Sequence, residues 1–296
     1  MSTPTASAPS QKKVSLITLR EKKERGEPIV SLTAYDYPTA LAVDAAGLDL
    51  ILVGDSLGMA VLGYETTLRV TMGEMLHHCR AVARGVKRAF LTGDMPFLSY
   101  QADVADAVRN AGKFLSEAGM DSVKLEGGSE MASTVSAIVR AGIPVMGHIG
   151  LTPQSVHQLG GYRAQGRKSD SARALLDDAF ALERAGCFAI VLESVPARVA
   201  TLISERLDVP TIGIGAGAGC DGQVLVSHDL LGIFDRFVPR FVKQYAGLGM
   251  EMLGAFEHYS AEVRQREFPA SEHTFTIPDD EWQAFLDGLD DAPSGG

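Results

Sequence analysis

The fold is decided by the stretch Leu52-Val53-Gly54-Asp55-Ser56-Leu57-Gly58, in which an apolar strand runs directly into a carboxylate, a hydroxyl and two glycines. The run that contains its start, residues 48–53, is too continuously apolar for a strand with one wet face. It predicts a strand covered on both sides, as in a parallel sheet. Ligands of parallel α/β folds gather where such strands end, so Asp55 is a candidate ligand contact. A helix cap or an Asx-turn is the alternative.

Apolar segments of strand length recur along the chain and alternate with segments of helical pattern. Besides 48–53, the expected strands are 28–33, 89–92, 122–125, 144–147, 188–192, 210–214 and 237–242. The expected helices are 15–25, 72–84, 104–117, 129–140, 171–184, 197–207 and 247–266, and three of them end at Ala-Gly pairs that suit left-handed caps. Eight strand–helix units in about 250 residues predict one (β/α)8 TIM barrel with an N-terminal helix and a C-terminal extension.

A doubly wound open sheet is the other fold that this alternation allows. The glycine run 213–219 meets the dinucleotide-binding pattern only in its looser form, ending in Ala218, and further glycines make a poor helix start there. We therefore expect a disordered tail over 1–13, the barrel over 14–268 and an acidic extension over 269–296. In that extension Trp282, Phe285 and Leu289 have helical spacing.

Composition excludes several classes of protein. With 296 residues, of which 46% are hydrophobic, the chain can bury a large core. Its 27 Lys and Arg against 37 acids argue against a nucleic-acid binder, and it has no run of about 18 apolar residues that would suggest a membrane span. Residues 1–10 do not resemble a signal peptide, and the three distant cysteines match no metal motif. We expect a soluble cytoplasmic protein.

Polar and ionisable residues stand at the ends of successive expected strands. In chain order they are Asp36, Asp55 with Ser56, Asp94, Lys124 with Glu126, His148 and Glu193. A barrel projects the ends of all its strands into one crater, so these side chains should converge on a volume of ligand size. Structural caps have no reason to cluster in this way, which favours a functional role for Asp55.

The residue types indicate metal-assisted chemistry. Asp55, Asp94 and Glu126 offer only hard oxygen ligands, which suit Mg²⁺ better than zinc, with water and substrate oxygens completing the coordination. Lys124 lies two residues from Glu126 on an extended chain, so both point to the same side, and its ammonium could bind a carboxylate. The alternative for this pair is a surface salt bridge, although an apolar strand is an unusual place for one.

Two further residues have open roles. Glu193 is separate in sequence from the acidic cluster and is free to act as a general base. A hydrogen-bond partner of another site residue is its alternative role. His148 is either a satisfied core histidine or a substrate contact. Glycine-rich segments 58–63, 160–167 and 213–219 follow strand ends, where loops can close over a ligand.

Between Ser31 and Phe275 the sequence resembles the ketopantoate hydroxymethyltransferase family. The blocks that carry this resemblance are Thr33-Ala34-Tyr35-Asp36-Tyr37, Val53-Gly54-Asp55-Ser56-Leu57-Gly58-Met59, Asp94-Met95-Pro96-Phe97, Val123-Lys124-Leu125-Glu126-Gly127-Gly128, Gly147-His148-Ile149-Gly150-Leu151-Thr152-Pro153-Gln154-Ser155, Gly160-Gly161-Tyr162, Gly213-Ile214-Gly215-Ala216-Gly217 and Glu272-His273-Thr274-Phe275. The resemblance implies a β/α barrel, a Mg²⁺ ion, a cytoplasmic enzyme of pantothenate synthesis and a homo-oligomer, typically a decamer.

The resemblance also implies a role for each site residue. By motif, Asp55, Asp94 and Glu126 resemble the family's metal ligands. Ser56 and Lys124 resemble its substrate contacts, and the expected substrate site also includes Asp55, Asp94 and His148. Glu193 resembles the general base. The implied reaction transfers a one-carbon unit from 5,10-methylenetetrahydrofolate to the small 2-oxo acid 3-methyl-2-oxobutanoate, giving 2-dehydropantoate.

Two rival functions remain to be compared with this one. Another metal-dependent oxo-acid barrel enzyme, such as a carbon–carbon lyase, would be expected to carry a catalytic cysteine in a loop flanked by lysine and glycine, and no such loop occurs. A non-catalytic barrel should have lost one or more of the charged site residues. All five are present: Asp55, Asp94, Lys124, Glu126 and Glu193.

Overall fold

Eight parallel strands close into a barrel in the computed structural model, which describes residues 12–233 and 238–290. The strands are β1 (Ile29–Thr33), β2 (Leu50–Val53), β3 (Phe90–Asp94), β4 (Ser122–Glu126), β5 (Val145–Gly150), β6 (Ala189–Glu193), β7 (Thr211–Ile214) and β8 (Gly222–Leu225). Pairing of β1 with β8, with Ile29 opposite Gly222, completes the circle. The barrel prediction is confirmed and the open sheet is excluded. Of the tail expected over 1–13, residues 1–11 lie outside the described ranges, as do residues 291–296 of the extension.

The strands are buried on both faces, as the apolar run at 48–53 predicts. Leu50 and Leu52 point into the barrel and join an interior cluster with Phe90, Met146 and Val191. The intervening positions point outward and pack against the helices; they include Ile51, Val53, Leu91, Val123, Leu125, Ile190 and Leu192. Period-2 alternation therefore divides each strand between two apolar cores.

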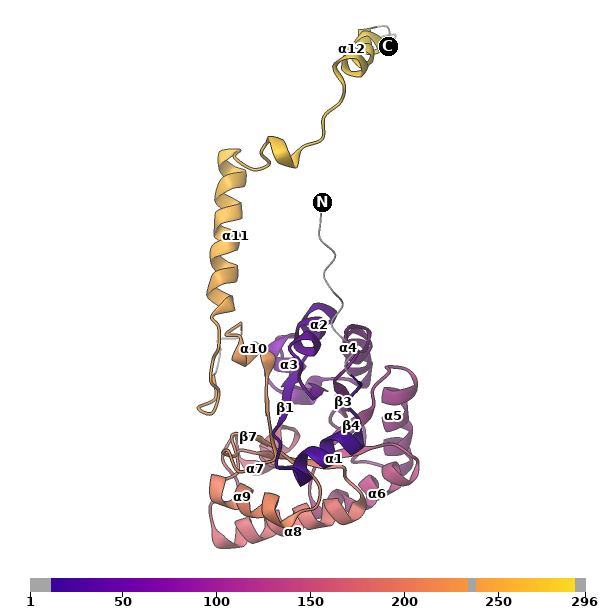
Figure 1. Cartoon of the computed structure of the whole chain (residues 1–296), viewed down its shortest axis with the longest axis vertical. Coiled ribbons are helices and arrows are strands. Elements are labelled where there is room, and N and C mark those ends of the chain that lie inside the picture. Colours follow the sequence, from indigo (N-terminus) through magenta and orange to yellow (C-terminus); the bar gives the residue numbers. More distant parts are fainter. Residues whose placement is uncertain (1–11, 234–237, 291–296) are drawn as a thin grey trace. The chain divides into compact units, whose positions relative to one another are not determined.

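The helices form the outer layer around the barrel (Figure 1). The longer ones are α2 (Tyr37–Ala45), α4 (Met72–Gly85), α5 (Val104–Ser116), α6 (Ala132–Arg140), α8 (Ser169–Ala185) and α9 (Ala197–Arg206). Short α3 (Leu57–Ala60), α7 (Val156–Leu159), α10 (Ser227–Leu230), η1 (Thr67–Arg69), η2 (Ser129–Met131) and η3 (Pro153–Ser155) lie in the connections. The glycines of the three Ala-Gly pairs, Gly119, Gly142 and Gly186, all have positive φ. Each allows the chain to leave its helix and enter the next strand.

An N-terminal helix, α1 (Leu16–Glu24), covers the end of the barrel where the strands begin. The side chain of Leu19 is buried in the interior cluster. Two lysines fix the helix to segments that precede strands: Lys22 Nζ lies 2.9 Å from Asp49 Oδ2, and Lys23 Nζ lies 2.8 Å from Asp221 Oδ2. Ligands must therefore meet the barrel at the carboxyl ends of its strands.

The eighth strand lies earlier in the chain than the sequence pattern predicts. The expectation of a strand over 237–242 is wrong for residues 238–242, which form turns and loops, while residue 237 lies outside the described part of the chain. Pro239 has no N–H to donate to a sheet. The real strand begins at Gly222. A Cβ atom there would lie 2.5 Å from the carbonyl oxygen of Ile29, so the close approach of β1 requires glycine at this position. Between β7 and β8 runs a loop, residues 215–221, which contains most of the glycine-rich segment 213–219.

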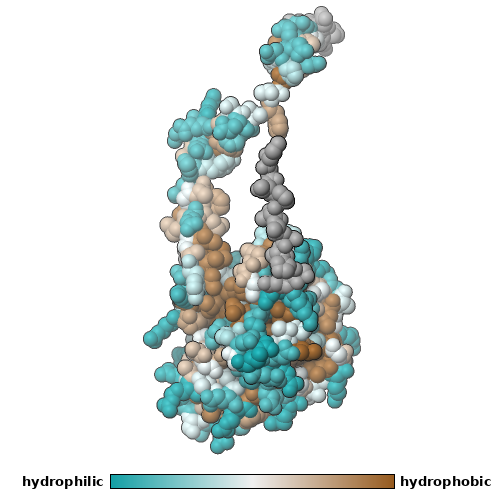
Figure 2. Space-filling model, viewed as in Figure 1, coloured by the Kyte–Doolittle hydropathy of each residue, from teal (hydrophilic) through white to brown (hydrophobic). Residues whose placement is uncertain are grey.

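The chain divides into two compact units at Ala246 and Gly247, and the second contains α11 (Leu248–Gln265), η4 (Ser271–His273) and α12 (Asp279–Asp290). Hydrophobic residues run along α11, where Met250, Leu253, Phe256 and Tyr259 are exposed (Figure 2). The apolar positions predicted in the extension fall on α12. Across the described residues, no helix combines the length and the hydrophobicity needed to cross a membrane.

Two glycine-to-alanine changes test this packing in opposite directions. A Cβ at Gly93 of β3 would overlap the buried ring of Phe114, so Gly93→Ala should lower the free energy of unfolding by roughly 1–3 kcal/mol. A Cβ at Gly112 of α5 meets nothing within 4 Å. Gly112→Ala should therefore raise the free energy of unfolding by about 0.5–1 kcal/mol through helix propensity. Urea unfolding of both variants measures these changes, and equal shifts of the same sign would contradict this account of the β3–α5 contact.

Candidate active site

The ionisable residues predicted at the strand ends line one pocket. They are Asp55 and Ser56 after β2, Asp94 of β3, Lys124 and Glu126 of β4, His148 of β5 and Glu193 of β6. Asp36 is the exception. Its Oδ1 accepts a hydrogen bond of 2.8 Å from the backbone N–H of Thr39, so it caps α2 and takes no part in the pocket lining.

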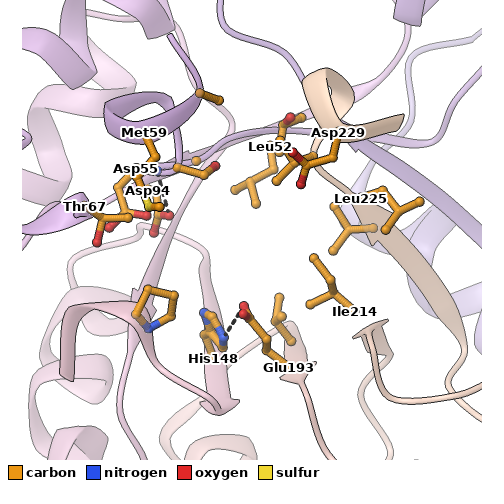
Figure 3. A pocket seen from close by; sticks show the side chains of 18 of the residues that line it. Leu52, Asp55, Met59, Thr67, Asp94, His148, Glu193, Ile214, Leu225 and Asp229 are labelled. Atoms are coloured by element: carbon orange, nitrogen blue, oxygen red, sulfur yellow. Dashed lines mark hydrogen bonds and ion pairs between the residues drawn. The ribbon is translucent and has the colours of Figure 1, made fainter. Parts of the chain in front are cut away.

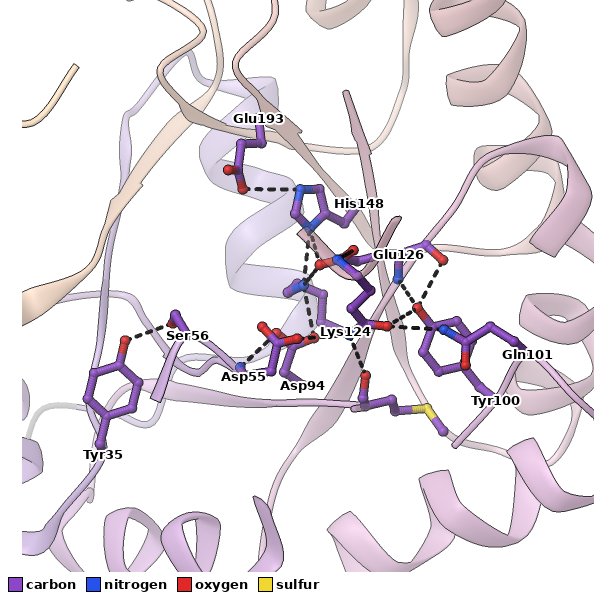
Figure 4. Close-up of polar contacts among 12 residues, drawn as sticks. Tyr35, Asp55, Ser56, Asp94, Tyr100, Gln101, Lys124, Glu126, His148 and Glu193 are labelled. Carbon is purple, nitrogen blue, oxygen red and sulfur yellow. Dashed lines mark hydrogen bonds and ion pairs between the residues drawn. The ribbon is translucent and has the colours of Figure 1, made fainter. Parts of the chain in front are cut away.

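Lys124 is the centre of this group (Figure 4). Its side chain is almost fully buried, and its Nζ lies 2.8 Å from Asp94 Oδ1 and 3.9 Å from Glu126 Oε1. The same ammonium lies 3.1 Å from His148 Nδ1. The surface salt bridge considered for this lysine is therefore excluded, because both partners are buried in the barrel.

Negative charge exceeds positive charge around this lysine. Asp55, Asp94 and Glu126 are all buried, and when ionised they place three negative charges against one positive charge. Burial, and then the charge of Asp94, raises the pKa of Asp55 to about 7. Burial also raises the pKa of Glu126, with the neighbouring acids adding to it. Burial by itself would lower the pKa of Lys124, but the three carboxylates outweigh it and raise that pKa. A divalent cation is the species that would neutralise this excess.

The donor set suits a hard cation, but the protein side chains do not complete a site. All the acidic donors are carboxylate oxygens, which Mg²⁺ prefers. Within residues 12–233 and 238–290, no three Asp, Glu, His or Cys side chains form a ready metal-binding cluster. Part of the carboxylate surface faces Lys124 instead. A cation held here therefore requires further oxygen ligands, as the sequence led us to expect of water and substrate.

His148 joins Lys124 to Glu193. Lys124 can only donate, so His148 Nδ1 accepts, which leaves Nε2–H facing Glu193 Oε2 at 3.3 Å. Burial, and then the nearby ammonium, lowers the pKa of His148 and keeps the ring neutral. His148 is thus neither a plain core histidine nor isolated from the acidic cluster, because it lies between Lys124 and Glu193.

The backbone on both sides of Glu193 is tightly constrained. Gly150, at the end of β5, has φ of +97°, and a Cβ there would overlap the carbonyl oxygen of Glu193. That carbonyl accepts a hydrogen bond of 2.8 Å from Leu151 N. Ser194 follows with φ of +50°, a left-handed conformation that costs a non-glycine residue roughly 1 kcal/mol. This strain sits directly beside the proposed base, where it fixes the turn that leaves β6.

Gln154 holds two acids in place and was missed by sequence reasoning. Its Nε2 donates to Asp55 Oδ2 at 3.0 Å, and its backbone N–H donates to Glu126 Oε2 at 2.9 Å. The Tyr100 hydroxyl in turn donates to Gln154 Oε1 at 2.7 Å. Asp55 therefore bonds to a side chain rather than capping α3, whose N-cap residue is Ser56. No local sequence signal separates this buried glutamine from an ordinary loop residue.

Ser56 presents a hydroxyl on the pocket wall. Its Oγ lies 2.8 Å from the hydroxyl of buried Tyr35, which comes from the end of β1. Because each hydroxyl can donate or accept, this pair can adapt to an anionic group in the pocket. The placement is compatible with the predicted substrate contact.

The pocket has a second, largely apolar half (Figure 3). Its walls include Leu52, Val191, Ile214 and Leu225, and its acid is Asp229 of α10. Asp229 was not among the predicted site residues, because the eighth strand was expected at 237–242 and not at Gly222–Leu225, just before α10. The pocket holds about 1090 Å³ of empty space, counting the part open to solvent.

The sequence matches the model of a family described as ketopantoate hydroxymethyltransferase over residues 13–271. It is 57% identical over 265 residues to the 3-methyl-2-oxobutanoate hydroxymethyltransferase of Carboxydothermus hydrogenoformans, covering 90% of this chain and 96% of that relative. With the enzyme of the same name from Moorella thermoacetica it shares 60% identity over 263 residues, covering 89% and 98%.

Solved structures with similar folds are much more distant in sequence. A phosphonopyruvate hydrolase in complex with oxalate and Mg²⁺ has a TM-score of 0.56 at 13% identity, covering 94% of this chain and 97% of that one. A 2,3-dimethylmalate lyase, a member of the PEP mutase/isocitrate lyase superfamily, has a TM-score of 0.55 at 17% identity, covering 93% and 95%. These likenesses support the barrel fold alone.

The charge of Asp229 should be visible in the pH dependence of stability. Burial raises its pKa from 3.8 to about 6, so the folded protein binds this proton more tightly than the unfolded chain does. The wild type therefore loses stability as pH rises from about 4 to 6, and Asp229→Asn removes this loss. We expect the variant to gain roughly 1–3 kcal/mol relative to wild type between pH 4 and 8, measured by urea unfolding.

A matched control for this measurement is Glu205→Gln, which neutralises an exposed acid on α9. It should show no comparable gain over the same pH range. A difference between Asp229→Asn and wild type that does not vary with pH would contradict the burial of this carboxylate.

Proposed function

The chain belongs to the ketopantoate hydroxymethyltransferase family, and from this premise we propose that it transfers a one-carbon unit from 5,10-methylenetetrahydrofolate to 3-methyl-2-oxobutanoate. The product is 2-dehydropantoate, an intermediate of pantothenate synthesis, made in the cytoplasm. The names of the relatives support the hydroxymethyltransferase activity itself. The observation that carries the detailed proposal is the buried Lys124 among three carboxylates, connected through His148 to Glu193.

Lys124 and Ser56 are proposed to bind the carboxylate of the oxo acid. Lys124 is the one cationic side chain among the described lining residues, and a charge-assisted hydrogen bond from its ammonium would neutralise the substrate anion. The hydroxyl of Ser56, next to that of Tyr35, supplies a second polar contact. Burial of Lys124 keeps water from competing for this charge.

We assign Asp55, Asp94 and Glu126 as the residues that would hold Mg²⁺, on the strength of their oxygen donors and their unbalanced charge. When bound, Mg²⁺ would supply Lewis-acid stabilisation of negative charge that develops on the keto oxygen, worth several kcal/mol. Gln154 keeps Asp55 and Glu126 in position through its side-chain amide and its backbone N–H.

Glu193 is the proposed general base. Its carboxylate would take the proton from C3 of the oxo acid, and the electron pair of that C–H bond would move toward the keto oxygen, giving an enolate. The methylene carbon then exchanges its two bonds to folate nitrogens for one bond to C3 and one bond to the oxygen of a water molecule, which becomes the hydroxyl of the product. The two nitrogens take up two protons, one released by that water and one from Glu193. His148 Nε2–H faces Glu193 Oε2 at 3.3 Å, next to the carboxylate that would take the proton.

The described residues give little support to the rival functions. A carbon–carbon lyase was expected to carry a cysteine in a loop flanked by lysine and glycine. Cys79 and Cys187 are buried in the core, and Cys220, in the loop before β8, does not line the pocket. Burial raises the pKa of Cys187 to about 12, which leaves it a poor nucleophile. A non-catalytic barrel would not be expected to keep a strained, uncompensated arrangement of charges. We retain a homo-oligomer, typically a decamer, as a proposal, and the exposed apolar positions of α11 support it.

Proton exchange tests the first chemical step without the second substrate. In heavy water, proton NMR should show that the enzyme exchanges the C3 proton of 3-methyl-2-oxobutanoate when Mg²⁺ is present. We expect Glu193→Gln to reduce both this exchange and overall turnover by roughly 10²-fold or more, because the base is lost. Mg²⁺ binding, measured by calorimetry, should stay nearly intact.

Near-normal exchange by Glu193→Gln would remove this residue from its assigned role. A complete lack of exchange by the wild type, with or without Mg²⁺, would count against enolisation itself.

Asp55→Asn should affect metal binding and catalysis together. The amide removes one negative charge from the set assigned to Mg²⁺, so we expect weaker Mg²⁺ binding and lower turnover, with part of the turnover recovered at higher Mg²⁺ concentration. Calorimetric titration with Mg²⁺ measures the affinity, with Glu205→Gln as a control of equal charge change. An unchanged affinity would show that the ligand assignment is wrong.

A further inference from the structure

The mechanism above leaves one buried acid of the pocket without a role. Asp229 lies across the open pocket from Asp55 and Asp94 (Figure 3). It is 9% exposed, and burial alone accounts for its raised pKa, with no charged neighbour among the described residues offsetting it. A carboxylate in such surroundings lowers stability unless a ligand satisfies it. Such groups are typical of functional sites.

The side of the pocket around Asp229 lies apart from the groups assigned to the oxo acid. The lining runs from Lys124 and its carboxylates across the open cavity to Asp229. The side around Asp229 is bounded by the aliphatic side chains of Leu52, Val191, Ile214 and Leu225. Such walls suit a flat, weakly polar ring system.

We propose that Asp229 binds the 2-amino-4-oxopyrimidine edge of the reduced folate, accepting hydrogen bonds from its 2-amino group and its ring N3–H. This inference rests on the proposed function, since it assigns a place to the folate co-substrate. The two donors lie side by side on that edge and match the two oxygens of one carboxylate. At neutral pH the Asp229 carboxylate is ionised, as this pairing requires.

The position of Asp229 also sets the direction of the folate. The pyrimidine ring is at one end of the bicyclic pterin, and the reactive methylene is attached on the side of the other ring. With the pyrimidine edge held at Asp229, the rest of the pterin extends across the aliphatic walls toward the side of the pocket that holds Asp55 and Asp94. The one-carbon unit is therefore directed to the end where the oxo acid is activated.

Direct binding of tetrahydrofolate to the full-length protein tests the assignment. The amide of Asp229→Asn offers one acceptor and one mismatched donor, so we expect anaerobic equilibrium dialysis to show roughly 10- to 100-fold weaker tetrahydrofolate binding. C3-proton exchange of 3-methyl-2-oxobutanoate without folate should stay within about twofold of wild type, because Asp229 takes no part in that half-reaction. Glu205→Gln, which changes an exposed acid on α9, should leave both measurements unchanged.

A tetrahydrofolate analogue without the 2-amino group provides a test that does not depend on a variant that folds. The wild type should bind it more weakly than tetrahydrofolate, and Asp229→Asn should show little further preference between the two. Equal affinity of the wild type for both ligands would overturn the inference. So would tight tetrahydrofolate binding by Asp229→Asn, and in either case intact C3 exchange and turnover would leave the proposed function standing. A wild type that neither exchanges the proton nor binds tetrahydrofolate would overturn both.

Discussion

The burial of one ammonium among three carboxylates is the constraint on which the site depends. Lys124 cannot satisfy Asp55, Asp94 and Glu126 together, so the barrel keeps an excess of negative charge at the ends of β2, β3 and β4. Such an arrangement is expensive in a low-dielectric interior and persists only where the surrounding structure enforces it. Here the closed sheet enforces it, because each charge is attached to a strand whose register is fixed by both neighbours.

The pocket has two chemically different ends. Around Lys124, groups are close, buried and strongly coupled, as charge stabilisation at a small polar substrate requires. Around Asp229, aliphatic walls surround a single acid, an environment suited to a larger ligand with a few donors. His148 belongs to the first end and connects its cation to Glu193. A reaction that joins a small anion to a bulky flat donor needs both environments within one cavity.

The sequence was sufficient for what depends on periodicity and strand ends. Continuous apolar runs located β1 to β7, and the residues that follow them placed Asp55, Lys124 and Glu193 in one crater. The eighth strand was not predicted, because it begins with glycine and shows no long apolar run. Asp229, which follows that strand, was therefore not predicted either. Gln154 was not predicted for a different reason. Its role comes from contacts with three separate elements, and no local pattern encodes such contacts.

The fastening of α1 has a consequence for the order in which the chain can fold. Lys23 pairs with Asp221 and donates to the carbonyl of Ser204, so the first helix finds its partners close to two hundred residues later in the chain. Closure of β1 onto β8 has the same requirement. Contacts of such long sequence separation form late and slowly. During synthesis on the ribosome, the edge of β1 that pairs with β8 therefore stays unpaired until nearly the whole barrel has emerged.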